Sequence, residues 1–149
     1  MSFGLQILLG CALMVVTTFL HSGGMVLGLS AFRSLLERSG RNHPTLWKPV
    51  PIAVLVIVMF LASVIECCVW AVTYLAVGAL EGIREALYFS TVTFSTLGYG
   101  DITLGEQWRL FASFEAANGL IMFGWTTALI AAAVARVYFP TAPSSSPST

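Results

Sequence analysis

Hydrophobic and polar positions divide the chain into long apolar runs separated by short polar breaks. The first run, residues 1–32, contains no Asp, Glu, Lys or Arg. The second, residues 51–77, contains one charge, Glu66, and the third carries none from Ala116 to Ala135. A helix needs about 20 consecutive apolar residues to cross the hydrocarbon core of a bilayer. The pattern therefore predicts three membrane-spanning helices.

A fourth apolar stretch, from Ala86 to Ser95, is compatible with a helix but too short to cross a bilayer. It leads into Thr96–Asp101, a glycine-rich segment that cannot remain helical. Non-helical backbone at membrane depth is tolerated only where protein buries it or where it lines a water-filled path. The two segments together predict a re-entrant helix and a functional loop.

Composition supports a membrane protein and excludes several other classes. Hydrophobic residues make up 57% of the chain and charged residues 9%, against about 25% charged in a soluble domain. So few charges cannot cover a soluble core, which argues against a soluble enzyme, a nucleic-acid binder and a disordered protein. The net charge of zero gives no reason to expect nucleic acid as a partner. No nucleophile–base pair or metal-ligand cluster stands out, so we expect neither an enzyme nor a cofactor.

The basic residues predict how the chain crosses the membrane. Four of the seven lie in residues 33–50, which we expect to form a loop, and Glu37 is the only acidic residue there. Because positive loops stay in the cytoplasm, the N-terminus should face outside and the re-entrant segment should return to the outer side. The tail, residues 139–149, is rich in Pro and Ser and is predicted to be disordered and cytoplasmic.

The glycine-rich segment has the residues that a cation path requires. Carbonyl oxygens stacked along an axis can replace the water shell of a cation. Gly98 and Gly100 can adopt positive φ, which allows neighbouring carbonyls to point the same way. Thr96 adds a hydroxyl at the inner end, Tyr99 would point away from the axis, and Asp101 would place a negative charge at the outer mouth.

The sequence Ser-Thr-Leu-Gly-Tyr-Gly-Asp at residues 95–101 resembles the potassium-channel signature Thr-Thr-Val-Gly-Tyr-Gly-Asp. Gly119–Ala128 resembles the inner helix of two-helix potassium channels, and the whole resemblance runs from Pro51 to Ala135. It implies an all-α membrane protein in which a pore domain, residues 51–138, follows an extra N-terminal transmembrane helix. The expected elements are the extra helix 1–32, the loop 33–50, the outer helix 51–78, the pore helix 83–95, the filter 96–101 and the inner helix 108–138.

The resemblance also implies the roles of individual residues. K⁺ would be bound as the permeant ion, not as a cofactor, by Thr96, Leu97, Gly98 and Tyr99, with Gly100 completing the filter and Asp101 at its mouth. The cavity-lining residues of the inner helix would be Gly119, Leu120, Phe123 and Thr127. One chain supplies one column of carbonyls and a filter needs four, so a cyclic homotetramer follows.

The function implied is a potassium-selective channel that conducts K⁺ passively, with K⁺, the bilayer and its own copies as partners. The plasma or inner membrane of a prokaryote is the expected location. Leu97 stands where the family has Val or Ile, which leaves a weakly selective Na⁺/K⁺ channel as an alternative. A non-conducting membrane subunit is the alternative from another class. The sequence does not identify a gating stimulus.

Three polar residues inside the predicted spans are costly to place in a membrane. With a rise of about 1.5 Å per residue, Glu66 and Asn118 lie at similar depths. We therefore expect a buried polar network of Glu66, Glu115 and Asn118, in which Glu66 bonds to Asn118 or lies close to Glu115. A gating or filter-coupling role is the alternative to helix fastening. His21 in the first run is interpreted as a packing residue, with proton relay as the alternative, and pH sensing by these groups stays open.

Overall fold

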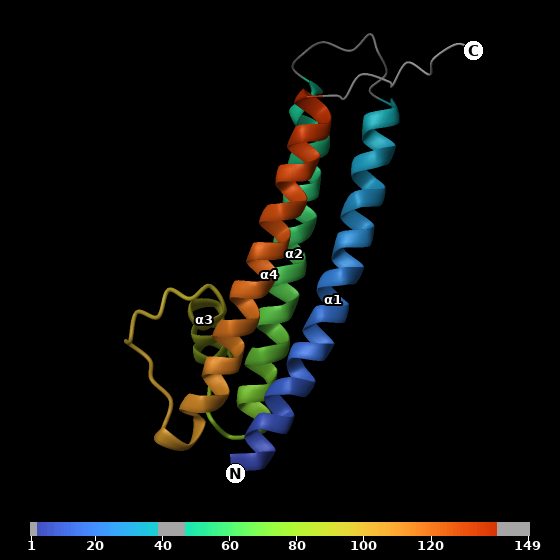
Figure 1. Ribbon diagram of the computed structural model, residues 1–149. Helices are drawn as coiled ribbons and strands as arrows, with labels where there is room; N and C mark the ends of the chain where they lie inside the picture. Colours follow the sequence, from blue (N-terminus) through green and yellow to red (C-terminus); the bar gives the residue numbers. More distant parts are fainter. Residues whose placement is uncertain (1–2, 39–46, 140–149) are drawn as a thin grey trace, which may run out of the picture.

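The computed structural model describes residues 3–38 and 47–139, and this part of the chain is helical throughout apart from its connections. The helices are α1 (Phe3–Arg38), α2 (Pro49–Ala76), α3 (Ile83–Phe94) and α4 (Glu106–Tyr138). By length and composition α1, α2 and α4 can each cross a membrane. The three long helices run side by side and the short α3 lies beside one end of α4 (Figure 1). The expected all-α membrane fold is confirmed.

The two ends of the bundle differ in what they carry. The start of α1, the end of α2, all of α3 and the start of α4 lie at one end, which we call the α3 end (Figure 1). The last turn of α1, the first turn of α2 and the last turn of α4 lie at the opposite end. Because α2 arrives at the α3 end and α4 departs from it, the segment between them enters and leaves on one side, as a re-entrant segment does.

The first helix is longer than the sequence analysis expects. α1 continues through Arg38, whereas we placed its end at residue 32 and a loop over 33–50. The physical reason is that Leu35, Leu36, Glu37 and Arg38 are all good helix formers, and charged residues end a membrane span without ending a helix. The bounds of α2, α3 and α4 differ by at most two residues from the expected outer, pore and inner helices. The rest of the expected tail, residues 140–149, lies outside the described residues.

Helix α1 is packed onto the other spans along one face. Its buried residues recur every three, four or seven positions, the spacing of a single helix face: Gln6, Gly10, Leu13, Thr17, His21, Gly28 and Phe32. A Cβ at Gly24 would lie 2.8 Å from Ala62 Cβ, and one at Gly28 would lie 2.8 Å from Leu55 Cδ1. Small residues at these positions let the backbones of α1 and α2 approach closely. The extra helix is therefore part of the bundle.

An aromatic cluster joins α2, α3 and α4 at the α3 end. The ring of Tyr74 lies 5.2 Å from that of Phe89 and 5.5 Å from that of Phe111, both in edge-to-face geometry. Trp70 lies 5.3 Å from Phe111 between ring centroids. Such pairs are favourable beyond the area they bury. The cluster holds the short α3 against the two long helices of the pore domain.

Candidate functional site

The segment that follows α3 is the predicted filter, and it is tied to the last turn of that helix. The backbone N–H of Thr96 donates to the carbonyl of Thr93 at 2.9 Å, and the N–H of Leu97 donates to the carbonyl of Val92 at 3.0 Å. The start of the filter segment therefore takes its position directly from α3.

Along this segment the sign of φ alternates. Thr96, Gly98 and Gly100 have φ of 59°, 55° and 77°, whereas Leu97 and Tyr99 are not among the residues with positive φ. The two glycines adopt the conformation expected of them. Thr96 was not expected to do so, because a β-branched residue in this region is strained. Positive φ at every second residue allows neighbouring carbonyls to point the same way, which is the property that a column of carbonyl ligands needs.

The predicted ion ligands Thr96, Leu97, Gly98 and Tyr99 thus lie on one non-helical segment, and their role stays a prediction. In the single chain Leu97 is 60% exposed and Tyr99 is 66% exposed. Among the described residues, more than half of the surface of each of these two side chains is left uncovered.

At the far end of the segment, Asp101 is held by Tyr88 of α3. The Tyr88 hydroxyl donates to Asp101 Oδ2 at 2.7 Å, and the Ile102 N–H donates to Oδ1 at 3.1 Å. The bond from Tyr88 is the main cause that lowers the pKa of Asp101, and the same bond raises the pKa of Tyr88. Asp101 is therefore negative at neutral pH at this end of the segment. Our sequence reasoning missed Tyr88; its signal is a hydroxyl-bearing ring on the exposed face of the helix before the loop.

On α4, three of the four predicted cavity-lining residues share an exposed face. Leu120 is 65% exposed, Phe123 is 39% exposed and Thr127 is also exposed. The prediction for Gly119 is wrong, because it is buried and a Cβ there would overlap the backbone carbonyl of Phe94. One step along a helix turns the side chain by about 100°, which places Gly119 on the face toward α3.

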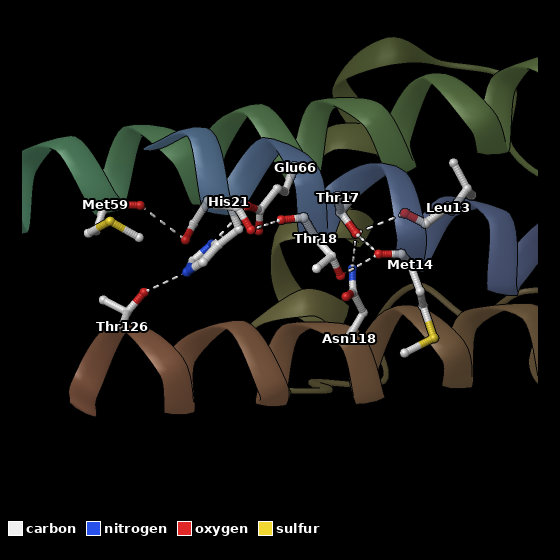
Figure 2. A network of polar contacts seen from close by, with 11 residues as sticks. Leu13, Met14, Thr17, Thr18, His21, Met59, Glu66, Asn118 and Thr126 are labelled. Carbon is white, nitrogen blue, oxygen red and sulfur yellow. Dashed lines mark hydrogen bonds and ion pairs between the residues drawn. The ribbon is translucent and has the colours of Figure 1, made fainter. Parts of the chain in front are cut away.

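The buried polar residues Glu66, Glu115 and Asn118 form hydrogen bonds with other side chains and not with one another. Glu66 Oε1 lies 2.9 Å from His21 Nδ1, and both side chains are fully buried. The other ring nitrogen of His21, Nε2, lies 3.0 Å from Thr126 Oγ1. Figure 2 shows His21 reaching from α1 to Glu66 on α2 and to Thr126 on α4. His21 therefore fastens the extra helix to both spans of the pore domain.

The bond expected between Glu66 and Asn118 does not form. Asn118 Nδ2 donates instead to Thr17 Oγ1 at 2.7 Å, and the Thr17 hydroxyl donates to the carbonyl of Leu13 at 2.8 Å (Figure 2). The reason is the place of α1, which packs against both α2 and α4 and offers polar side chains to each. Sequence reasoning missed Thr17 and Thr126, which in an isolated sequence look like ordinary hydroxyls on membrane helices.

Glu115 forms a second, separate polar cluster. The Tyr74 hydroxyl donates to Glu115 Oε2 at 2.6 Å, and Ser90 Oγ is hydrogen-bonded to Glu115 Oε1. Ser90 Oγ also lies 2.8 Å from the carbonyl oxygen of Cys67, to which it can donate. Glu115 thus joins α4 to α2 and α3 and is not part of the Glu66 pair. Tyr74 and Ser90 were not singled out from the sequence.

The predicted ion path and a metal centre would use different groups of the chain. Within the described ranges, no group of three His, Cys, Asp or Glu side chains could hold a metal ion. The backbone of residues 96–100 and the carboxylate of Asp101 are the groups predicted to meet a cation. The two buried clusters lie between helices.

Comparison with known proteins supports the same interpretation. No curated protein and no solved structure matches the chain. The family described as ion channel matches residues 50–136, more than half of the chain and the whole stretch from α2 to the end of α4 except their terminal residues. The chain therefore belongs to the two-transmembrane-helix, potassium-channel-like family of ion channels, with α1 as an additional helix.

Proposed function

We propose that the protein is a potassium-selective channel that conducts K⁺ passively through a pore formed by four copies of the chain. The observation that carries the proposal is the alternation of φ from Thr96 to Gly100, in a Gly-Tyr-Gly-Asp segment that follows a re-entrant helix. The carbonyls of Thr96, Leu97, Gly98 and Tyr99 would replace the hydration shell of K⁺. Asp101 adds a negative charge at the mouth of the filter.

The tetramer follows from what a single chain leaves incomplete. One chain gives one column of carbonyls, and four columns around an axis enclose an ion. The exposed side chains of Leu97 and Tyr99 are those that neighbouring copies would cover. A cavity of about 270 Å³ beside the filter, lined by Val92, Asp101 and residues near them, offers space for a neighbour's side chain. Closed cyclic symmetry is the usual form of such an assembly.

The remaining parts act on the ion before and after the filter. Leu120, Phe123 and Thr127 would line the cavity on one side of the filter. The C-terminal end of α3 carries the partial negative charge of a helix dipole, which favours a cation in the cavity. We place the α3 end outside and the opposite end, which carries Arg38, Lys48 and Arg136, in the cytoplasm, because positive segments stay inside. The resemblance to two-helix channels favours the plasma or inner membrane of a prokaryotic cell.

A weakly selective cation channel is the second candidate, and one observation favours it. Leu97 is unbranched at Cβ, unlike the Val or Ile of the potassium-channel signature, so it packs differently behind the carbonyl column. In that case the fold and assembly would be the same, and Na⁺ would pass at a rate comparable to K⁺.

Flux of K⁺ into liposomes that contain the purified protein tests conduction, with two glycine variants as a matched pair. Gly98 has φ of 55° and no neighbour within 4 Å of an added Cβ, so Gly98→Ala strains the backbone without a clash. Gly105 has φ of −53° and equally open surroundings. We expect Gly98→Ala to abolish flux and Gly105→Ala to preserve it. Flux that is absent in the parent, or unaffected by Gly98→Ala, would refute conduction through this filter.

A further inference from the structure

The face between α3 and α4 is held by two contacts that lie one helical turn apart. Ser90 is hydrogen-bonded to Glu115, and the carbonyl of Phe94 lies directly against Gly119. On α4, Glu115 and Gly119 are four residues apart, and so are Ser90 and Phe94 on α3. Residues four apart share one face of a helix. The two contacts therefore lie along one face of each helix and together fix the axial position and the rotation of α3 relative to α4.

The carboxyl group of Glu115 is anchored on both sides. Tyr74 on α2 donates to one oxygen at 2.6 Å, and Ser90 on α3 occupies the other. Ser90 in turn lies 2.8 Å from the Cys67 carbonyl of α2. Glu115 and Tyr74 are each fully buried, as is Ser90. These groups are therefore shielded from water in the folded chain; the bonds of Ser90 hold α3 to α4 and α2, and the bond from Tyr74 holds Glu115 in place.

The position of α3 passes directly to the filter. Val92, between the two contact residues of α3, accepts from the N–H of Leu97 at 3.0 Å and from that of Gly98 at 3.4 Å. Leu97 and Gly98 directly follow Thr96, the first residue of the alternating segment. A rotation or shift of α3 on α4 would displace the first filter peptides by a similar amount.

We propose that Glu115 is a positioning residue for ion selectivity: through Ser90 and Tyr74 it sets the placement of α3, and through α3 the geometry of the filter. The inference rests on the proposed function, because it concerns the selectivity of the same filter. It assigns a role to an acidic side chain that lies on α4, away from the filter segment that follows α3, and that would not contact an ion.

Substitutions at this cluster separate hydrogen bonding from charge. In Glu115→Gln the amide oxygen can accept from Tyr74, and the amide nitrogen can donate to Ser90, so the links to both helices survive. Glu115→Leu removes both links. Ser90→Ala removes only the link to α3 and is the mildest change. We expect K⁺ selectivity to be kept where the hydrogen bonds to Ser90 and Tyr74 are kept, as in Glu115→Gln, and to be lowered where they are lost.

A matched control is offered by Thr17 on α1, which is bonded to the same helix α4. Thr17→Val removes the acceptor of the Asn118 side chain, a buried bond of 2.7 Å between α4 and α1. This change also breaks one buried hydrogen bond on α4, but it leaves the face toward α3 intact. A loss of selectivity that merely reflects a less stable protein would appear in Thr17→Val as well.

The test is the K⁺/Na⁺ permeability ratio of the purified channel in bilayers. We expect Ser90→Ala and Glu115→Leu to lower the ratio by about tenfold, the change that corresponds to 1.4 kcal/mol. Glu115→Gln and Thr17→Val should stay within about twofold of the parent, which is well below that change. A parent without K⁺ selectivity would refute the proposed function itself. A selective parent with equally selective Ser90→Ala would overturn the inference, as would a Gln variant that fails like the Leu variant.

A second measurement covers variants that assemble but conduct poorly. K⁺ that binds an ordered filter stabilises the assembly by mass action, so the melting temperature should rise when Na⁺ is exchanged for K⁺. We expect this rise in the parent, in Glu115→Gln and in Thr17→Val, and its loss in Ser90→Ala. A rise of the same size in Ser90→Ala would contradict a role for the cluster in filter order.

Discussion

Replacing His21 by Phe should destabilise the protein strongly, although Phe fits the same space. The His21 ring lies 5.6 Å from that of Trp125, and a Phe ring can keep this contact. The change removes the partner of Glu66 Oε1, while Glu66 Oε2 already has no hydrogen-bond partner among the described residues. A buried carboxyl group would then have neither oxygen bonded.

The size of the effect follows from the number of groups left without partners. A buried polar group without a partner costs about 1–3 kcal/mol, and more where it is charged. Thr126 can bond back to a carbonyl of its own helix, so Glu66 carries most of the loss. We expect His21→Phe to lower the free energy of unfolding by about 3 kcal/mol, and Glu66→Leu, which orphans His21, by about 2 kcal/mol.

The double variant is the decisive member of the set. When both partners are replaced by apolar groups, no buried polar group of the pair is left unsatisfied, and such replacements are often nearly neutral. His21→Phe with Glu66→Leu should therefore be more stable than either single variant. Glu66→Gln serves as the control, because its amide still reaches His21, and it should cost about 1 kcal/mol or less.

Equilibrium unfolding in mixed detergent micelles measures these differences, with Trp fluorescence as a probe because Trp125 lies beside His21. The double-mutant cycle should give a coupling energy of about 2 kcal/mol between the two positions. If the losses of the single variants simply add in the double variant, the buried pair is absent. The fastening of α1 to the pore domain by His21 would then be refuted.

Two other residues give sharp expectations. Gly119→Ala should prevent the normal packing of α3, because its Cβ would overlap the Phe94 carbonyl. Gly124→Ala, with open surroundings, should assemble normally. Native mass measurement of the assembly distinguishes the two variants. Tyr88→Phe removes the bond that lowers the Asp101 pKa, so that pKa should rise toward its ordinary value. Since the charge of Asp101 is lost as pH falls through its pKa, the acid-induced fall in current should begin at higher pH in Tyr88→Phe, which pH-jump recordings measure.

The spans and the backbone conformation of Gly98 and Gly100 could be predicted because each depends on a local property. The length of an uncharged run decides whether a helix crosses a membrane, and the runs around Glu66 and from Ala116 to Ala135 met that condition. The positive φ of Gly98 and Gly100 could be predicted from the residue type alone, since glycine adopts positive φ without strain. The positive φ of Thr96 could not be predicted in this way, because a β-branched side chain disfavours that conformation.

The partners of the buried polar residues could not be predicted, since they depend on how whole helices are placed. Rise per residue gives the depth of Glu66 and Asn118 but not the direction in which each points. That direction is set by α1, which brings Thr17 and His21 to both spans. The burial of Gly119 likewise follows from where α3 lies, which no periodicity in α4 encodes.

The reversal potential of the purified protein in a planar bilayer, with K⁺ on one side and Na⁺ on the other, tests the central claim most directly. A filter built from residues 96–100 should hold the reversal potential close to the K⁺ equilibrium value, and Ba²⁺, which is nearly the size of K⁺ with twice the charge, should block the current. A reversal potential near zero with sustained current would mean that Na⁺ and K⁺ pass equally. That result would contradict a potassium-selective filter.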